Sequence, residues 1–223
     1  MNDSVFFSPA EKIFPWVLFR VPTEARIVFL TFDDGPDVHS TPQVLSILKD
    51  FRAKASFFIK GEKIPAAPGL LSQCTREGHS IGNHGFSHVP LWLRKKSFIS
   101  EEIQRTNGLI HQACGLQPLL FRPPYGRFRP AMKKISEAQN LQMVLWNVDS
   151  RDYKEKTSAQ DIVRNVLTSV KPGSVVLFHD SGKNVSQTIQ ALPAILRHLL
   201  DRGFSFSPLS ELFRLKKLRE NAQ

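Results

Sequence analysis

The sequence predicts an α/β fold built from six or seven βα units. Short runs of β-branched, aromatic and other apolar residues alternate with helical patterns along the whole chain, which is typical of parallel strands joined by helices. The chain has 223 residues, 41% of them hydrophobic, which suffices for the core of one domain, and no linker or repeat divides it. Such units close into a barrel or form a strongly twisted open sheet.

Seven segments are predicted to be strands, because each is short and rich in strand-forming residues. They are Ile27 to Phe32, Ala55 to Ile59, His79 to Asn83, Leu119 to Arg122, Leu141 to Trp146, Ser174 to His179 and Phe204 to Ser207. In a barrel or an open parallel sheet, the chemistry is expected at the carboxyl ends of these strands.

Helices are predicted between the strands wherever apolar residues recur every three or four positions. The first begins at Thr41-Pro42, because proline is pre-set for the start of a helix. Gly61 to Glu77 is expected to form one helix, and Thr157 or Ser158 is expected to cap a later one. Two long apolar stripes are Ile99, Ile103, Thr106 and Ile110, and then Ile189, Leu192, Ile195, Leu196 and Leu199.

The bulk composition argues against several classes of protein. Thirty Lys and Arg against 20 Asp and Glu give a net charge of +10, yet these basic residues are dispersed and no nucleic-acid recognition motif accompanies them. No segment approaches the roughly 20 apolar residues of a membrane-spanning helix. The N-terminus lacks the features of a signal peptide, so a cytoplasmic location is expected. Cys74 and Cys114 are too few for a disulfide framework.

A single domain is expected over residues 1–223, with 1–25 as an N-terminal extension and 208–223 as a basic C-terminal tail. The tail places four cations among leucines and is interpreted as a short amphipathic segment. The sequence leaves the oligomeric state open.

Two pairs of polar residues follow predicted strands. The first strand ends in the adjacent carboxylates Asp33 and Asp34. Adjacent strand residues face opposite sides, but the Gly-Pro turn that follows can aim both acids into one site, one at a metal and one at a water. After the third strand, His84 and His88 lie four residues apart. On one helical turn their rings would point the same way and could share a cation.

Three further strands also end in polar residues. The fourth runs into a segment of two prolines and a glycine, which would fix the backbone and leave the Tyr125 N–H free to stabilise an oxyanion. Arg122, a permanent cation in the same segment, is expected to pair with a nearby carboxylate. The fifth strand leads to Asp149 to Tyr153, and the sixth ends at His179. Five such segments on one rim predict a catalytic site.

In order along the chain, these segments resemble the five motifs of the polysaccharide deacetylase family (NodB homology domain, carbohydrate esterase family 4). They are TFDDGP at Thr31 to Pro36, HxxxH at His84 to His88, RPPYG at Arg122 to Gly126, DSxD at Asp149 to Asp152 and LxH at Leu177 to His179. The first and third are highly specific. The resemblance implies a distorted, incomplete (β/α) barrel of about seven βα units.

The resemblance also implies a metal site. Asp34, His84 and His88 would bind one divalent ion, for which Zn²⁺ is best suited and Co²⁺, Mn²⁺, Ni²⁺ and Fe²⁺ are also compatible. The ion would polarise the acetyl carbonyl of the substrate and acidify a water molecule. The implied reaction is N-deacetylation of an amino sugar in a carbohydrate.

The remaining roles follow from the same resemblance. Asp33 would be the general base, held by Arg122, and the Tyr125 N–H would help to stabilise the oxyanion. His179, oriented by Asp152, would protonate the leaving amine.

Leu177 and Tyr153 would close around the acetyl methyl group. Two positions depart from the family pattern: Gly85 replaces a Ser or Thr whose hydroxyl would stabilise the histidine loop, and Tyr153 replaces a tryptophan. Ser87 is a candidate to compensate for the first.

Non-sugar amides such as ureides or N-formyl groups are the alternative substrates. A pseudoenzyme that only binds is the rival from a different class, and the retained base, ligands and acid argue against it.

Overall fold

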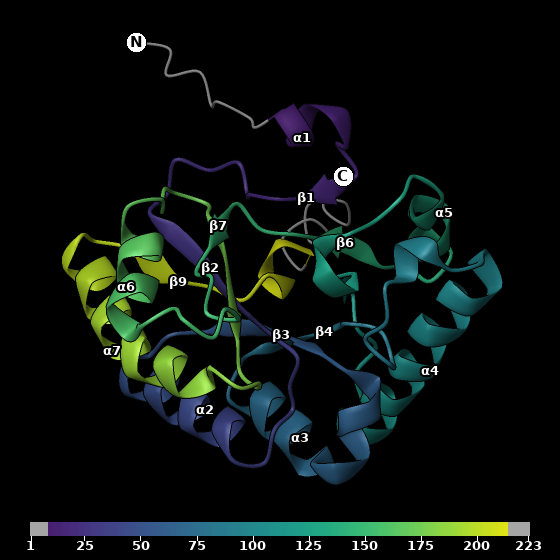
Figure 1. Cartoon of the computed structure of the whole chain (residues 1–223), viewed down its shortest axis with the longest axis horizontal. Helices are drawn as coiled ribbons and strands as arrows, with labels where there is room; N and C mark the ends of the chain where they lie inside the picture. Colours follow the sequence, from purple (N-terminus) through teal and green to yellow (C-terminus); the bar gives the residue numbers. More distant parts are fainter. Residues whose placement is uncertain (1–8, 214–223) are drawn as a thin grey trace, which may run out of the picture.

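The computed structural model describes residues 9–213, which form one curled parallel sheet with helices around its outside (Figure 1). The strands are β1 (Val17–Leu18), β2 (Ile27–Asp33), β3 (Ala55–Ile59), β4 (Ser80–Asn83), β5 (Leu120–Phe121), β6 (Gln142–Val144), β7 (Val148–Asp149), β8 (Val175–His179) and β9 (Ser205–Phe206). The helices are α1 (Pro9–Ile13), α2 (Ser40–Asp50), α3 (Pro68–Arg76), α4 (Lys96–Cys114), α5 (Ala131–Glu137), α6 (Ala159–Leu167) and α7 (Val185–Asp201). Three short 3₁₀ helices are η1 (Gly61–Ala66), η2 (Leu91–Leu93) and η3 (Pro124–Gly126).

The order of the strands shows why the sheet must curl. The hydrogen-bonded path runs β1-β6-β5-β4-β3-β2-β8-β7, with β9 beside β2. β6 and β7 therefore lie near opposite ends of the path, yet only residues 145–147 separate them along the chain. A connection this short spans at most about 14 Å, so the two ends of the sheet are drawn toward each other. The result is the incomplete barrel that the family resemblance implies.

Successive side chains of each strand point to opposite faces, so one set faces the helices and the other faces the barrel interior. In β2, Val28, Leu30 and Phe32 belong to the large core under the helices, and the residues between them face the barrel interior. Strands β3 and β8 follow the same pattern. The interior core is smaller and consists of Val21, Phe29, Phe58, Leu120, Val144, Val175 and Leu209. The interior side of β2 therefore leads from an apolar core to the polar carboxyl end.

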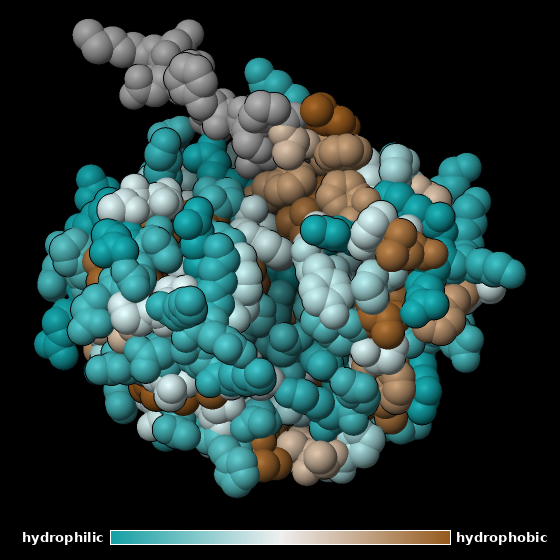
Figure 2. Space-filling view, in the orientation of Figure 1, coloured by the Kyte–Doolittle hydropathy of each residue, from teal (hydrophilic) through white to brown (hydrophobic). Residues whose placement is uncertain are grey.

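The N-terminal residues take part in the barrel. β1, within the predicted extension of residues 1–25, pairs with β6 as an edge strand. Val21 N–H donates to the Gly173 carbonyl at 2.8 Å, and Gly173 has a φ of 78°. A Cβ atom at Gly173 would lie 1.8 Å from the Val21 oxygen, so only glycine fits this contact. Figure 2 shows apolar residues gathered over α1 and β1.

Several sequence expectations need correction in detail. The predicted helix over Gly61 to Glu77 is divided into η1 and α3, because Pro65 and Pro68 interrupt it. β1 and β7 were not predicted, and β5 and β6 are shorter than expected. Ser158 caps α6 in a capping box with Asp161, as predicted.

Part of the expected basic tail, residues 214–223, lies outside the described residues. Within residues 9–213, no helix is long and apolar enough to cross a membrane.

We expect Phe32→Ala to lower the free energy of unfolding by about 3–5 kcal/mol, because it leaves a cavity in the helix-facing core. Phe32 is fully buried, and its ring stacks on those of Phe57 and Phe178 at centroid distances of 5.2 and 5.5 Å. Urea unfolding followed by circular dichroism would measure the change. Leu116→Ala is the control, because Leu116 is 51% exposed. Equal unfolding midpoints for the two variants would contradict this account of the core.

Candidate active site

The pairing of β2 with β8 places two candidate catalytic groups at one level. Asp33 lies opposite His179, and Thr31 lies opposite Leu177. All four residues belong to the interior-facing sets of their strands, because the helix-facing core takes the residues between them. A carboxylate and an imidazole from neighbouring strands therefore enter the site side by side.

Arg122 is a fully buried cation that spans the interior of the barrel. Its Nη1 donates to Asp33 Oδ1 at 2.7 Å and to Thr31 Oγ1 at 2.8 Å. Nε and Nη2 donate to carbonyl oxygens at the end of β6, at 3.3 and 3.0 Å, and the guanidinium stacks on the Phe58 ring at 4.0 Å. A buried charge is tolerated when it is both paired and hydrogen-bonded, and these contacts supply both. Arg122 thus fixes one oxygen of Asp33.

Asp34 reaches both histidines, and Asp33 also comes near His84, with its Oδ2 3.7 Å from the His84 Nε2. The Asp34 backbone is left-handed, with a φ of 74°, so the turn separates the two adjacent acids. Asp34 Oδ1 lies 3.1 Å from His88 Nε2 and 3.8 Å from His84 Nε2. Burial by itself would raise the pKa of Asp34, but the nearby imidazoles, His84 foremost, bring it below its usual value.

The two histidine rings face Asp34 through their Nε2 atoms. His84 Nδ1 lies 2.7 Å from the Arg122 carbonyl oxygen, which assigns the proton to Nδ1 and leaves Nε2 as an acceptor. Burial, together with His84, lowers the pKa of His88 to about 4. The free Nε2 of His84 and the lowered pKa of His88 both suit metal binding.

The histidine loop is not the helical turn that the HxxxH spacing predicts. Residues 84–90 are irregular, and His88 has a φ of 53°. Glu102 of α4 holds the loop by accepting from the Phe86 and Ser87 N–H groups at 3.0 and 2.8 Å and from Ser87 Oγ at 2.8 Å. Gly85 has a φ of 78°, which suits glycine. Ser87 does anchor this loop, with Glu102 as its partner.

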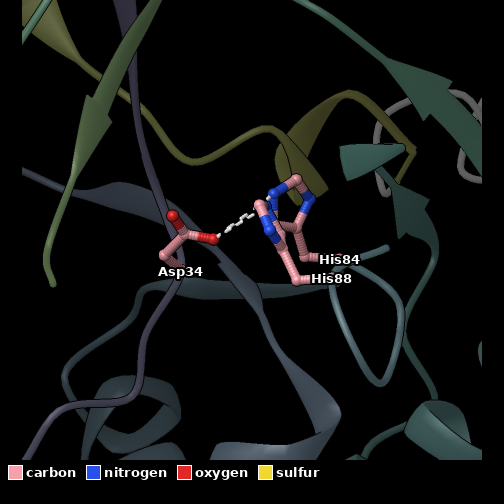
Figure 3. Close-up of side chains that lie close together, drawn as sticks. All are labelled: Asp34, His84 and His88. Atoms are coloured by element: carbon pink, nitrogen blue, oxygen red, sulfur yellow. Dashed lines mark ion pairs between the residues drawn. The ribbon is translucent and has the colours of Figure 1, made fainter. Parts of the chain in front are cut away.

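Asp34, His84 and His88 form a donor set that fits a divalent metal. Figure 3 shows the carboxylate from the β2 turn directed at the two rings. Among the described residues, Asp34 Oδ1 is buried without a hydrogen-bond partner, although His88 Nε2 lies 3.1 Å away. Two ligands of one tetrahedral Zn²⁺ lie about 3.4 Å apart. The distances of 3.1 and 3.8 Å from this oxygen lie on either side of that value.

The half-buried His179 and the buried Asp152 form a pair on the other side of the site. His179 Nδ1 lies 2.7 Å from Asp152 Oδ1, and the His179 backbone N–H donates to Oδ2 at 2.8 Å. Thr188 Oγ1 donates to the same Oδ2 at 2.9 Å, so the carboxylate is fixed. Burial acts to lower the pKa of His179, but the hydrogen bond and charge of Asp152 outweigh it and raise this pKa to about 9. The ring is thus held as imidazolium at neutral pH.

The site opens into a cavity of about 640 Å³, which Leu177 and Tyr153 also line. The Tyr153 ring lies 5.6 Å from His179, and its hydroxyl donates to Asp149 at 3.2 Å. Tyr125 has a φ of 63°, and its N–H donates to no acceptor within residues 9–213. All of the predicted site residues therefore border or support one cavity.

Sequence reasoning missed five residues that line the cavity: Pro90, Trp92, Leu93, Arg127 and Trp146. Only the tertiary fold brings η2 and the end of β6 to this rim, although Arg127 directly follows the RPPYG motif.

A second missed feature is backbone strain. Asp34, His88 and Tyr125 are non-glycine residues with positive φ, and such residues cluster at functional sites.

Comparison with known proteins places this site in a family. The polysaccharide deacetylase family matches residues 20–144. The chain is 39% identical over 203 residues to a peptidoglycan-N-acetylglucosamine deacetylase of Bacillus cereus, covering 90% of this chain and 94% of the relative. It is 34% identical to a chitooligosaccharide deacetylase of Bradyrhizobium sp., covering 84% and 90%.

A solved structure agrees with the fold. The crystal structure of a peptidoglycan N-acetylglucosamine deacetylase in complex with an N-hydroxybenzamide matches with a TM-score of 0.86 and 33% identity, covering 92% of this chain and 96% of the other. This similarity confirms the incomplete barrel. The chain belongs to the polysaccharide deacetylase family.

Proposed function

We propose that this chain is a metal-dependent hydrolase that removes the acetyl group from an N-acetylated amino sugar of an oligosaccharide, polysaccharide or lipid-linked glycan. The observation that carries the proposal is one cavity that joins the arginine-held Asp33, the Asp34–His84–His88 set and the Asp152-bound His179. Relatives named for peptidoglycan and chitooligosaccharide deacetylation support the substrate class. No feature of residues 9–213 favours a ureide or an N-formyl group.

Asp34, His84 and His88 would hold the ion. One carboxylate and two imidazoles suit Zn²⁺ best among the divalent ions considered. When bound, the ion supplies Lewis acidity toward the acetyl carbonyl. The chain prepares this site by fixing the Nδ1 proton of His84 on the Arg122 carbonyl oxygen, so that Nε2 faces the ion.

The chain's own residues carry the protons. Asp33 would accept a proton from the attacking water, because Arg122 occupies only one of its oxygens. As the C–N bond breaks, His179 would donate the proton on Nε2 to the leaving amine, while Asp152 holds Nδ1. The free Tyr125 N–H would stabilise the oxyanion. Acetate and a free amino sugar result, and no covalent intermediate with the chain is needed.

The proposed metal site predicts the effect of a chelator on activity and on the fold. Removing the metal with a chelator should abolish acetate release from N-acetylglucosamine oligomers, and returning Zn²⁺ should restore it, whereas the fold should survive because the barrel has its own core. Acetate release and far-ultraviolet circular dichroism would be measured on the same samples. Full activity in metal-free protein would contradict the proposed metal role, and no release from any N-acetylated sugar with metal added would contradict the proposed function.

The raised pKa of His179 predicts how activity depends on pH. Because the pKa of His179 is raised to about 9, the proton needed by the leaving amine is present below that pH and is lost as the pH rises through it. The alkaline limb of kcat/KM should therefore fall near pH 9. Asp152→Asn removes the charge that raises this pKa, so the limb should move toward pH 6.5 or lower, and the rate should fall on the order of 10²-fold.

The pH profiles of both variants would test this assignment. His179→Ala should remove the alkaline limb altogether and leave a low residual rate. An alkaline limb that stays in place in Asp152→Asn and in His179→Ala would show that another group donates the proton.

A further inference from the structure

Two loops beside the cavity carry positive charge that no acid of their own offsets. Residues 78–100 and 115–136 contain no Asp or Glu. Apart from the buried Arg122, the basic residues that follow the cavity-lining Leu93 and Gly126 along the chain form what we call the cationic rim, defined as Arg94, Lys95, Lys96, Arg127 and Arg129. Four of these side chains are exposed, and Arg129 is half-buried.

The cationic rim adjoins the cavity directly. Trp92, Leu93 and Arg127 line the cavity, and Arg94 follows Leu93 in the chain. Arg129 Nη2 donates to the Arg94 carbonyl oxygen at 2.5 Å, which ties the two loops together. The Arg127 guanidinium lies 5.7 Å from the centre of the Trp92 ring. A cation and an apolar aromatic surface thus border the same side of the site.

These cations are available to a ligand. Within residues 9–213, no acidic side chain forms an ion pair with any member of the cationic rim. Of the other charges in the cavity wall, Asp33 is paired with Arg122 and His179 with Asp152, and Asp34 belongs to the proposed metal site. The loop at residues 149–157, which contributes Tyr153 to the cavity, has three acids and three bases. The excess positive charge of residues 78–100 and 115–136 therefore lies on the side of the cavity that Trp92 and Arg127 line.

We propose that the cationic rim binds carboxylates carried by the glycan, so that the chain acts on an anionic, peptidoglycan-like polymer in preference to a neutral chitooligosaccharide. The inference rests on the proposed deacetylase function and narrows its substrate. A neutral N-acetylated sugar offers these cations no partner, although its ring can pack on Trp92. An arginine fork matches a carboxylate with two parallel hydrogen bonds, and clustered charge of one sign raises the rate of encounter.

A matched pair of substrates would test the proposal on the zinc-loaded full chain. One is a peptidoglycan-derived oligosaccharide with free carboxylates, and the other is the same oligosaccharide with those carboxylates amidated. We expect kcat/KM for the first to exceed that for the second on the order of tenfold at low salt, mainly through KM. The preference should disappear near about 1 M salt, where the Debye length is about 3 Å.

Charge reversal would assign the preference to the rim. Arg127→Glu should reduce the ratio of the two kcat/KM values on the order of tenfold, and Arg127→Lys should reduce it less, because the charge stays in place while the guanidinium fork is lost. The matched control is Lys171→Glu, the same change of charge at an exposed residue near the amino end of β8, away from the site, and it should leave the ratio unchanged.

Equal kcat/KM values for the two substrates, or a preference that survives Arg127→Glu, would overturn this inference while acetate release upheld the deacetylase function. Acetate from neither substrate, nor from simple N-acetylglucosamine oligomers, would overturn both.

Discussion

The buried ion pair between Arg122 and Asp33 organises the rest of the site. Arg122 reaches from β5 to β2 and to the end of β6, so one guanidinium fixes the relative positions of three parts of the barrel. Its backbone carbonyl also sets the tautomer of His84. Leaving one partner of a buried ion pair alone typically costs about 3–5 kcal/mol. The pair therefore links the stability of the interior to the position of the proposed base and to one proposed metal ligand.

Parallel topology explains why the chemistry collects at one rim. The interior-facing columns of β2 and β8 end in polar groups at their carboxyl ends, Asp33 and His179, and the pairing register sets these two side by side. The Asp34 turn then reverses the direction of the next carboxylate with a left-handed backbone. Two adjacent acids can serve different partners because the strand ends between them. Loops supply what the strands cannot, namely His88, Tyr125 and the cationic rim.

Much of this arrangement could be predicted from the sequence, because strand periodicity and five motifs in order determine which side chains meet at a rim. The histidine loop was interpreted wrongly as a helical turn, since the spacing of His84 and His88 says nothing about the left-handed backbone of His88 or about the anchoring Glu102. Trp92 and Arg127 were missed because no motif marks them and only tertiary packing brings them to the cavity. The cytoplasmic location stays a prediction.

We assign different tasks to the two adjacent acids: Asp33, held by Arg122, is the proposed base, and Asp34, beside the histidines, is a proposed metal ligand. Metal content and acetate release, measured together on Asp33→Asn and Asp34→Asn, test this assignment most directly. Asp33→Asn should keep about one zinc ion per chain and lose turnover, whereas Asp34→Asn should lose the ion, as His88→Ala should. A metal-free Asp33→Asn beside a zinc-loaded Asp34→Asn would show that the two roles are reversed.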